Sequence, residues 1–143
     1  MADHDNYEDD YIAAILDETR TIALVGASPK ADRPSFGVMQ YLLSKGYTVI
    51  PVNPGQAGKE ILGQKVYASL ADIPDEIDMI DVFRAPEYLG EVVSDALALS
   101  SRPKVIWGQL SVRDDAAVEP AEAAGIKVVM DRCPAIEIPR LGL

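Results

Sequence analysis

The stretch "IALVGASPKADRPSFGVMQYLLSKGY" runs from Ile22 to Tyr47, near the start of the chain. Its apolar run ends at Gly26, and the next residues, up to Pro34, could not be helical throughout. A pattern with helical spacing then begins near Ser35, where apolar residues recur three and four positions apart. The stretch therefore predicts a strand, a glycine turn, a loop carrying Lys30 and Arg33, and a helix.

The same strand-then-helix theme repeats along the chain. Five β-rich apolar runs cover residues 21–26, 47–53, 79–83, 104–109 and 127–132. Helical patterns cover residues 7–19, 35–45, 86–99 and 112–124. Strands that alternate with helices must run parallel with right-handed crossovers, and continuous apolar runs indicate strands covered on both faces. We expect an α/β fold with a doubly wound five-stranded parallel sheet, strand order 3-2-1-4-5 and the first strand central.

Length and composition are consistent with one such domain over residues 1–143, in which residues 1–20 form an acidic N-terminal tail and helix. The net charge is −10, and seven of the 23 acidic residues precede Arg20. A chain without a basic footprint is not expected to bind nucleic acid. We find no apolar run long enough to span a membrane and no targeting segment, and one cysteine allows no internal disulfide, so we expect a cytoplasmic protein.

A ligand site is expected at the carboxyl ends of the strands, where strand order reverses in open α/β sheets. Gly26 lets the backbone turn there and approach a ligand closely. The helix after the loop points unpaired N–H groups toward this edge, Ser28 adds a hydroxyl, and Lys30 and Arg33 add positive charge. Together they favour an anion such as a phosphate. The alternative is an ordinary turn with two solvated basic side chains.

The absence of two known nucleotide-binding motifs limits which nucleotides we expect the site to bind. The dinucleotide fingerprint G-x-G-x-x-G is absent, and Asn53 stands where an acidic residue would hold the ribose of NAD. NAD is therefore disfavoured, whereas NADP remains open because Lys30 or Arg33 could contact its additional phosphate. The Walker pattern of ATPases is also absent.

The ordered set "VGAS", "PVNP", "DVFR" and "DRCP" resembles small stand-alone CoA-binding proteins. These are Rossmann-like domains similar to the N-terminal domain of the succinyl-CoA synthetase α subunit and of ADP-forming acyl-CoA synthetases. The resemblance extends from about Thr21 to Glu137 and implies coenzyme A as the ligand. It implies that one loop holds the pyrophosphate, a second borders the adenosine and a third lines the cleft. The residues so assigned are Gly26, Ala27 and Ser28 with Lys30 and Arg33, then Asn53 and Pro54, then Phe83 and Arg84.

The ligase activity of the synthetases does not follow from this resemblance. Those enzymes act through a phosphorylated histidine in another domain, whereas the sole histidine here is His4, which we expect in a mobile acidic tail. The prediction is therefore binding of CoA or an acyl-CoA without ligase chemistry, with no metal site and an unidentified protein partner. The alternatives are an NADP-dependent oxidoreductase and an interaction protein with a vestigial nucleotide pocket.

Some residues near the predicted edge have two interpretations. Cys133 is either a packed small side chain or a thiol near the ligand, and Gly108 either opens space or relieves packing. Arg84 could bind phosphate or pair with Glu87. Asp81 lies inside an apolar strand and needs a partner or an exposed position.

Overall fold

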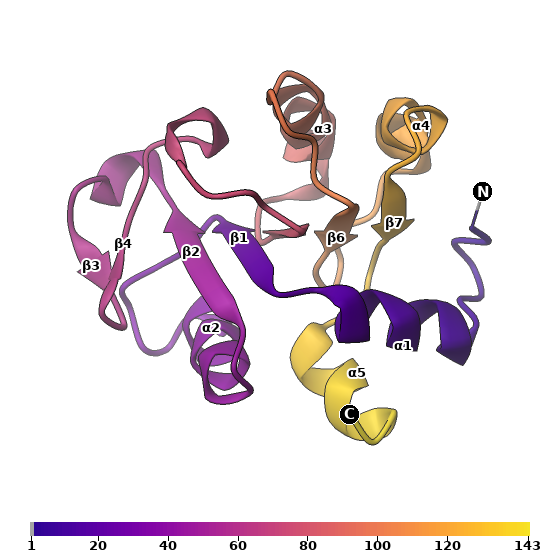
Figure 1. The fold of residues 1–143 in the computed structure, drawn as a ribbon, viewed down its shortest axis with the longest axis horizontal. Coiled ribbons are helices and arrows are strands. Elements are labelled where there is room, and N and C mark those ends of the chain that lie inside the picture. Colours follow the sequence, from indigo (N-terminus) through magenta and orange to yellow (C-terminus); the bar gives the residue numbers. More distant parts are fainter. Residues whose placement is uncertain (1) are drawn as a thin grey trace.

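The computed structural model describes residues 2–143, and its framework is a five-stranded parallel sheet in the order β2-β1-β5-β6-β7 (Figure 1). The strands are β1 (Thr21–Val25), β2 (Thr48–Val52), β5 (Met79–Val82), β6 (Val105–Gly108) and β7 (Lys127–Val129). All four pairings between these strands are parallel. The predicted fold class, including five parallel strands, is confirmed.

The predicted strand order is met once an outer segment is counted as a strand. Tyr67 forms an isolated parallel bridge with Val52, on the outer side of β2. With this segment as the third, the order begins 3-2-1 as expected. However, the run at residues 79–83, which we counted as third, lies on the other side of β1, where Leu24 faces Asp81. Among the five strands alone the order is 2-1-3-4-5, so the middle strand is β5 and not β1.

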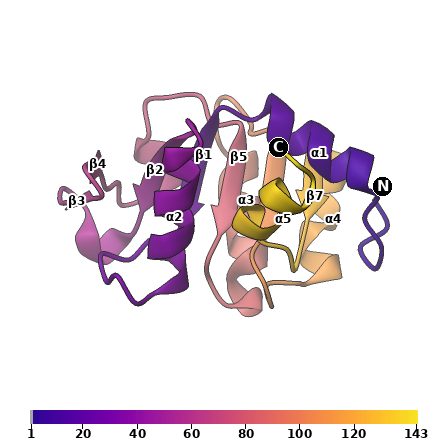
Figure 2. The same cartoon turned by 90° about the horizontal axis from the view of Figure 1, so that it is seen from below.

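Helices cover both faces of the sheet (Figures 1 and 2). One face carries α1 (Asp9–Glu18), α2 (Pro34–Ser44) and α5 (Pro134–Arg140), and the other carries α3 (Leu89–Leu97) and α4 (Asp115–Ala123). Ile12, Met39 and Ile138 share a core with Trp107 on the first face, while Val93 and Val118 pack with Ile80 on the second. Since both faces are buried, the strands needed continuous apolar runs rather than alternating ones. The N-terminal helix is confirmed.

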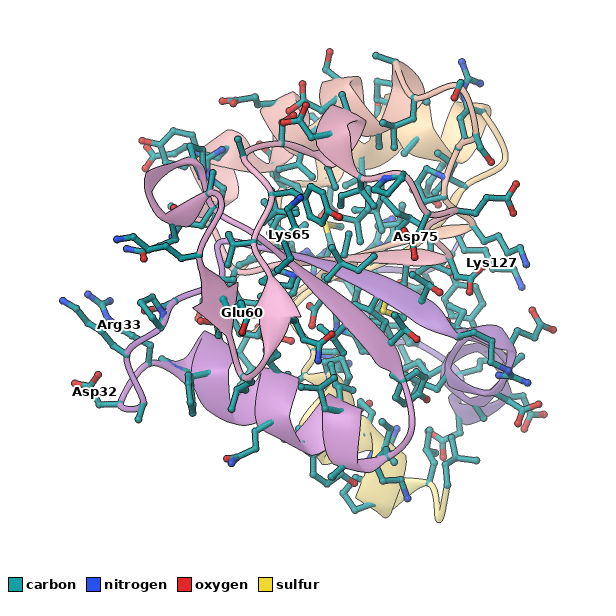
Figure 3. The ribbon with its side chains drawn as sticks, turned by 60° about the vertical axis from the view of Figure 1, so that its left-hand side comes forward. Asp32, Arg33, Glu60, Lys65, Asp75 and Lys127 are labelled. Carbon is teal, nitrogen blue, oxygen red and sulfur yellow. The ribbon has the colours of Figure 1, made fainter. Side chains whose placement is uncertain are left out.

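Local structure in two segments was not predicted from the sequence. Residues read as loop after β2 contain the turn η1 (Pro54–Gln56) and a small hairpin of β3 (Glu60–Ile61) and β4 (Gln64–Lys65), in which Glu60 lies opposite Lys65 (Figure 3). Its strands are too short to show a period. Helix α5 was missed because it contains two prolines, yet Pro134 stands at its first turn, where a missing N–H costs nothing.

The N-terminal tail is not free as we expected. The two ring nitrogens of His4 lie 2.8 Å from Glu122 Oε1 and 2.7 Å from the Tyr7 hydroxyl. His4 keeps only 10% of its side chain exposed. The expectation of a mobile His4 was wrong because its contact with Glu122 of α4 joins residues 118 positions apart, which no local pattern reveals.

Gly108 serves packing at the end of β6. The chain turns back after Gln109, and Val112 N–H donates to the Gln109 carbonyl at 2.8 Å. A Cβ at position 108 would lie 2.5 Å from the Val112 carbonyl oxygen. The turn therefore requires a residue without a side chain.

We expect Gly108→Ala to lower the free energy of unfolding by about 1–3 kcal/mol, because the turn would have to shift to relieve the contact. Gly37→Ala is the matched control. Gly37 is exposed within α2, and apart from the neighbouring helix backbone no atom of the described residues lies within 4 Å of its ideal Cβ. The Gly37→Ala variant should gain about 0.5–1 kcal/mol from better helix propensity. Urea denaturation of both variants measures the contrast, and equal stabilities would refute the packing explanation.

No helix in residues 2–143 is both long enough and apolar enough to cross a bilayer.

Candidate functional site

A cavity of about 420 Å³ opens at the carboxyl ends of β1, β2 and β5, within the size range of small-molecule sites. It lies where the chain crosses from one side of β1 to the other, which is the position expected for a ligand in an open α/β sheet. Four of the predicted residues line it: Gly26, Asn53, Pro54 and Arg84. The remaining lining comes from Val25, Val52, Ala68, Ser69, Leu70, Glu91, Val92 and Asp95.

Gly26 makes the turn that forms the cavity floor. Its φ angle is +89°, and its N–H donates to the Val52 carbonyl at 3.1 Å. A Cβ there would lie 2.7 Å from the Phe83 carbonyl oxygen and 3.3 Å from Arg84 Cγ. Both the left-handed backbone and the close approach of the loop after β5 therefore require glycine.

Asn53 joins the loops after β1 and β2. Its side-chain Nδ2–H donates to the Ala27 carbonyl at 2.8 Å, and its Oδ1 accepts from Gly55 N–H at 2.8 Å. An aspartate could accept the second bond but could not donate the first. This observation gives a structural reason for asparagine at a position where dinucleotide-binding proteins use an acid.

The basic loop lies at the rim and not in the cavity lining. Lys30 and Arg33 are exposed, and Figure 3 shows Asp32 and Arg33 at the outer end of the loop. The Ser28 hydroxyl accepts from Lys30 N–H at 3.2 Å, which folds the loop back on itself. Helix α2 starts with Pro34 and has no side-chain cap at its N-terminus, so its first-turn amides have no side-chain acceptor.

Arg84 reaches the cavity from the end of β5. Its guanidinium carbon lies 4.2 Å from the centre of the Tyr88 ring, and Nη1 lies 3.5 Å from Glu91 Oε1. The predicted alternative partner, Glu87, makes no ion pair with it within the described residues. Tyr88 belongs to the turn η3 (Pro86–Tyr88), which leads into α3. Arg84 is thus held beside the cavity by a cation–π contact and a partly exposed ion pair.

Two of the predicted site residues pack in the core instead of lining the cavity. Ala27 is buried, Phe83 is half-buried, and both pack in the core beneath α2. Neither side chain lines the cavity. Conversely, the acidic residues Glu91 and Asp95 do line it, and sequence reasoning missed them because they lie on the helix after β5 rather than at a strand end. Their spacing of four on a predicted helix was the signal available.

A second group of polar atoms is buried near this edge without partners. Both oxygens of Asp81 and Oε1 of Gln109 are buried and have no hydrogen-bond partner among the described residues. Burial raises the pKa of the Asp81 carboxyl well above its usual range, so the neutral acid is favoured.

Cys133 is buried as well, and Trp107 is a core residue whose Nε1–H donates to the Arg132 carbonyl at 2.9 Å. Within residues 2–143 no group of three or more acidic, histidine or cysteine side chains could hold a metal ion.

Comparison with known proteins shows which family the chain belongs to. A family model described as a CoA binding domain matches residues 20–139. The chain belongs to this CoA-binding domain family. The match includes every residue that lines the cavity and the whole basic loop, and it confirms the predicted resemblance to CoA-binding domains.

Three relatives give the scale of the similarity. The chain is 36% identical over 122 residues to the uncharacterized protein YneT of Bacillus subtilis, covering 85% of this chain and 87% of YneT. A solved structure from Thermus thermophilus has a TM-score of 0.88 at 40% identity, covering 94% of this chain and 98% of that one. The ADP-forming acetate–CoA ligase II of Archaeoglobus fulgidus is 32% identical over 89 residues, which cover 61% of this chain but only 13% of the ligase.

Proposed function

We propose that this protein binds coenzyme A or an acyl-CoA at the cavity between β1, β2 and β5. The observation that carries the proposal is the glycine turn at the cavity floor, with Gly26 packed against the Phe83 carbonyl and joined to β2. Such a turn lets a phosphate approach the backbone closely. Membership of the CoA-binding domain family supports coenzyme A as the compound that carries this phosphate.

The charges around the cavity suit the two ends of the nucleotide. Glu91 and Asp95 offer acceptors for the hydroxyl and amino groups of an adenosine on the α3 side. Coenzyme A also carries a pyrophosphate and a 3′-phosphate, about four negative charges at neutral pH. Those groups need the opposite side, where the Ser28 amide and the side chains of Lys30 and Arg33 are available, since the Gly26 and Ala27 amides donate to the Val52 carbonyl. Arg84 lies between the two sides.

The position of Asn53 disfavours NAD as the ligand. Both polar atoms of its side chain are used in bonds to the neighbouring loops. Its single acceptor oxygen, already bonded to Gly55 N–H, cannot hold two ribose hydroxyls as the two carboxylate oxygens of the acid in the dinucleotide fingerprint do.

Ligase chemistry is not part of the proposal. The similar region covers only 13% of the acetate–CoA ligase of Archaeoglobus fulgidus. The one histidine of this chain, His4, is bonded to Glu122 and Tyr7 and does not line the cavity. We infer a role in binding or presenting a CoA compound.

Native mass spectrometry of the purified protein tests the proposal. We expect a bound species with the mass of CoA or an acyl-CoA, or the appearance of that species after CoA is added. Gly26→Ala, which disturbs the cavity floor, should lose it. A protein that retains NADP and rejects CoA would support the alternative of an NADP-dependent oxidoreductase and contradict the proposal.

The basic loop should contribute measurable affinity. A charge-assisted hydrogen bond contributes about 1.5–3 kcal/mol, so Lys30→Ala and Arg33→Ala should each weaken CoA binding by about tenfold or more. Lys59→Ala, an exposed lysine beside the hairpin, is the matched control and should bind CoA as the parent does. Calorimetric titration with CoA and dephospho-CoA shows which of the two residues contacts the 3′-phosphate. The variant that lacks this contact should lose affinity for CoA but not for dephospho-CoA. Unchanged affinity in both variants would mean that the two basic side chains are only solvated.

A further inference from the structure

The outer strand β7 has its free edge covered by tyrosine hydroxyls. Tyr11 Oη donates to the Val128 carbonyl at 2.9 Å and accepts from Val128 N–H at 3.2 Å, and Tyr7 Oη accepts from Met130 N–H at 2.8 Å. The other side of the strand pairs with β6, where Val129 faces Trp107. The groups bonded by the tyrosines are therefore the ones that a further strand would use.

The covering segment, residues 2–11, lies on the β7 side of the molecule (Figure 1). Hydrogen bonds and an ion pair hold it in place. His4 lies between Glu122 and Tyr7, and one neutral tautomer satisfies every group: Nε2–H donates to Glu122, and the Tyr7 hydroxyl donates to Nδ1. The Ala2 N–H also donates to Glu122 at 3.3 Å, and Asp5 pairs with Arg113 at 2.8 Å. These polar contacts replace the backbone ladder that would otherwise close the sheet.

The exposed form of this edge would be self-complementary. In an antiparallel pair of two β7 strands centred on Val129, Val128 of one copy lies opposite Met130 of the other. The N–H and C=O groups of these residues then bond reciprocally around a two-fold axis. The same register brings Lys127, which makes no ion pair within the described residues, near Asp131 of the second copy.

We propose that residues 2–11 mask a strand-addition site on β7, and that the partner fitting the unmasked edge is a second copy of this chain. The segment keeps the sheet edge closed, and its release joins two sheets through β7. This proposal is independent of the ligand, because none of the residues involved lines the cavity.

The masking is tested by amide hydrogen exchange in the full chain. Tyr7→Phe/Tyr11→Phe keeps the two rings and removes only the hydroxyls. Exchange at Val128 and Met130 should accelerate by at least about fivefold, since each amide loses its hydrogen-bond partner. The amide of Val129, on the β6 side, is the internal control and should not change. Unchanged exchange at Val128 and Met130 would overturn the proposal.

Association is tested by sedimentation of the full-length Tyr7→Ala/Tyr11→Ala variant. We expect a monomeric parent and a dimeric variant at the same concentration, and a monomer again when Lys127→Glu is added, since two acidic side chains would then meet in the pair. A parent that already dimerises, a variant that stays monomeric, or a dimer indifferent to Lys127→Glu would each contradict the proposal. If circular dichroism shows the alanine variant unfolded, the Tyr7→Phe/Tyr11→Phe variant replaces it with the same expectations.

Discussion

Replacing Gly26 by alanine should lower the free energy of unfolding by about 2–5 kcal/mol and weaken CoA binding by at least tenfold. Two physical effects add at this position. The φ angle of +89° costs an L-residue about 1–2 kcal/mol. The new Cβ would also lie 2.7 Å from the Phe83 carbonyl oxygen, and relieving that contact moves the loop that holds Arg84.

Gly46→Ala separates these two effects. Gly46 has a φ angle of +93°, close to that of Gly26, yet within residues 2–143 no atom beyond its two chain neighbours lies within 4 Å of its ideal Cβ. This variant should lose only the conformational cost, about 1–2 kcal/mol, and should keep the CoA affinity of the parent, because Gly46 follows α2 at the opposite end from the basic loop. Urea denaturation and calorimetric titration measure both quantities. Equal losses in stability for the two variants would show that the contact with Phe83 is not tight.

Replacing Asp81 by asparagine should remove a large part of the pH dependence of stability. The Asp81 carboxyl is buried with no hydrogen-bond partner among residues 2–143, and this burial raises its pKa in the folded protein well above the unfolded value of about 3.9. Above that unfolded value the folded state holds more protons than the unfolded state. The free energy of unfolding therefore falls as pH rises from about 4 toward the raised pKa, with a slope of up to about 1.4 kcal/mol per pH unit.

Urea denaturation across a pH series tests this expectation. The stability of Asp81→Asn relative to the parent should increase as the pH rises from 4 toward neutrality, because asparagine never ionises. Asp75→Asn removes an exposed carboxyl and serves as the control for the loss of one acidic side chain. Parallel profiles for Asp81→Asn and the parent would contradict the assignment of an unpaired buried acid.

Local sequence patterns could predict the features that depend on one segment of the chain. Continuous apolar runs predicted a parallel sheet covered on both faces, and the turn at Gly26 predicted where the cavity would lie, because each follows from one segment and general packing rules. The cavity-lining residues at the ends of β1, β2 and β5 could be predicted for the same reason. The side chains of Ala27 and Phe83 were not, since whether a side chain faces the cavity or the core depends on which face of the sheet its position occupies.

The parts that could not be predicted depend on contacts between distant residues. The double role of Asn53 requires the carbonyl of Ala27 to lie beside it, and the placement of His4 requires Glu122. Neither relation has a sequence period. Glu91 and Asp95, the two acidic residues that line the cavity, were not predicted. In the sequence they look like ordinary solvated helix residues, and only the neighbouring loops place them beside the cavity.

Calorimetric titration of the purified protein with CoA, dephospho-CoA, NADP and NAD under identical buffer conditions decides whether the cavity binds coenzyme A. We expect saturable binding of CoA and weaker binding of dephospho-CoA, because a phosphate contact is lost. NAD should bind most weakly, because Asn53 offers one partly used acceptor oxygen where a carboxylate would hold both ribose hydroxyls. Binding of CoA should disappear or weaken strongly in Gly26→Ala and persist in Gly46→Ala. Tighter binding of NAD or NADP than of CoA, or no binding of CoA by the folded protein, would contradict the proposed function.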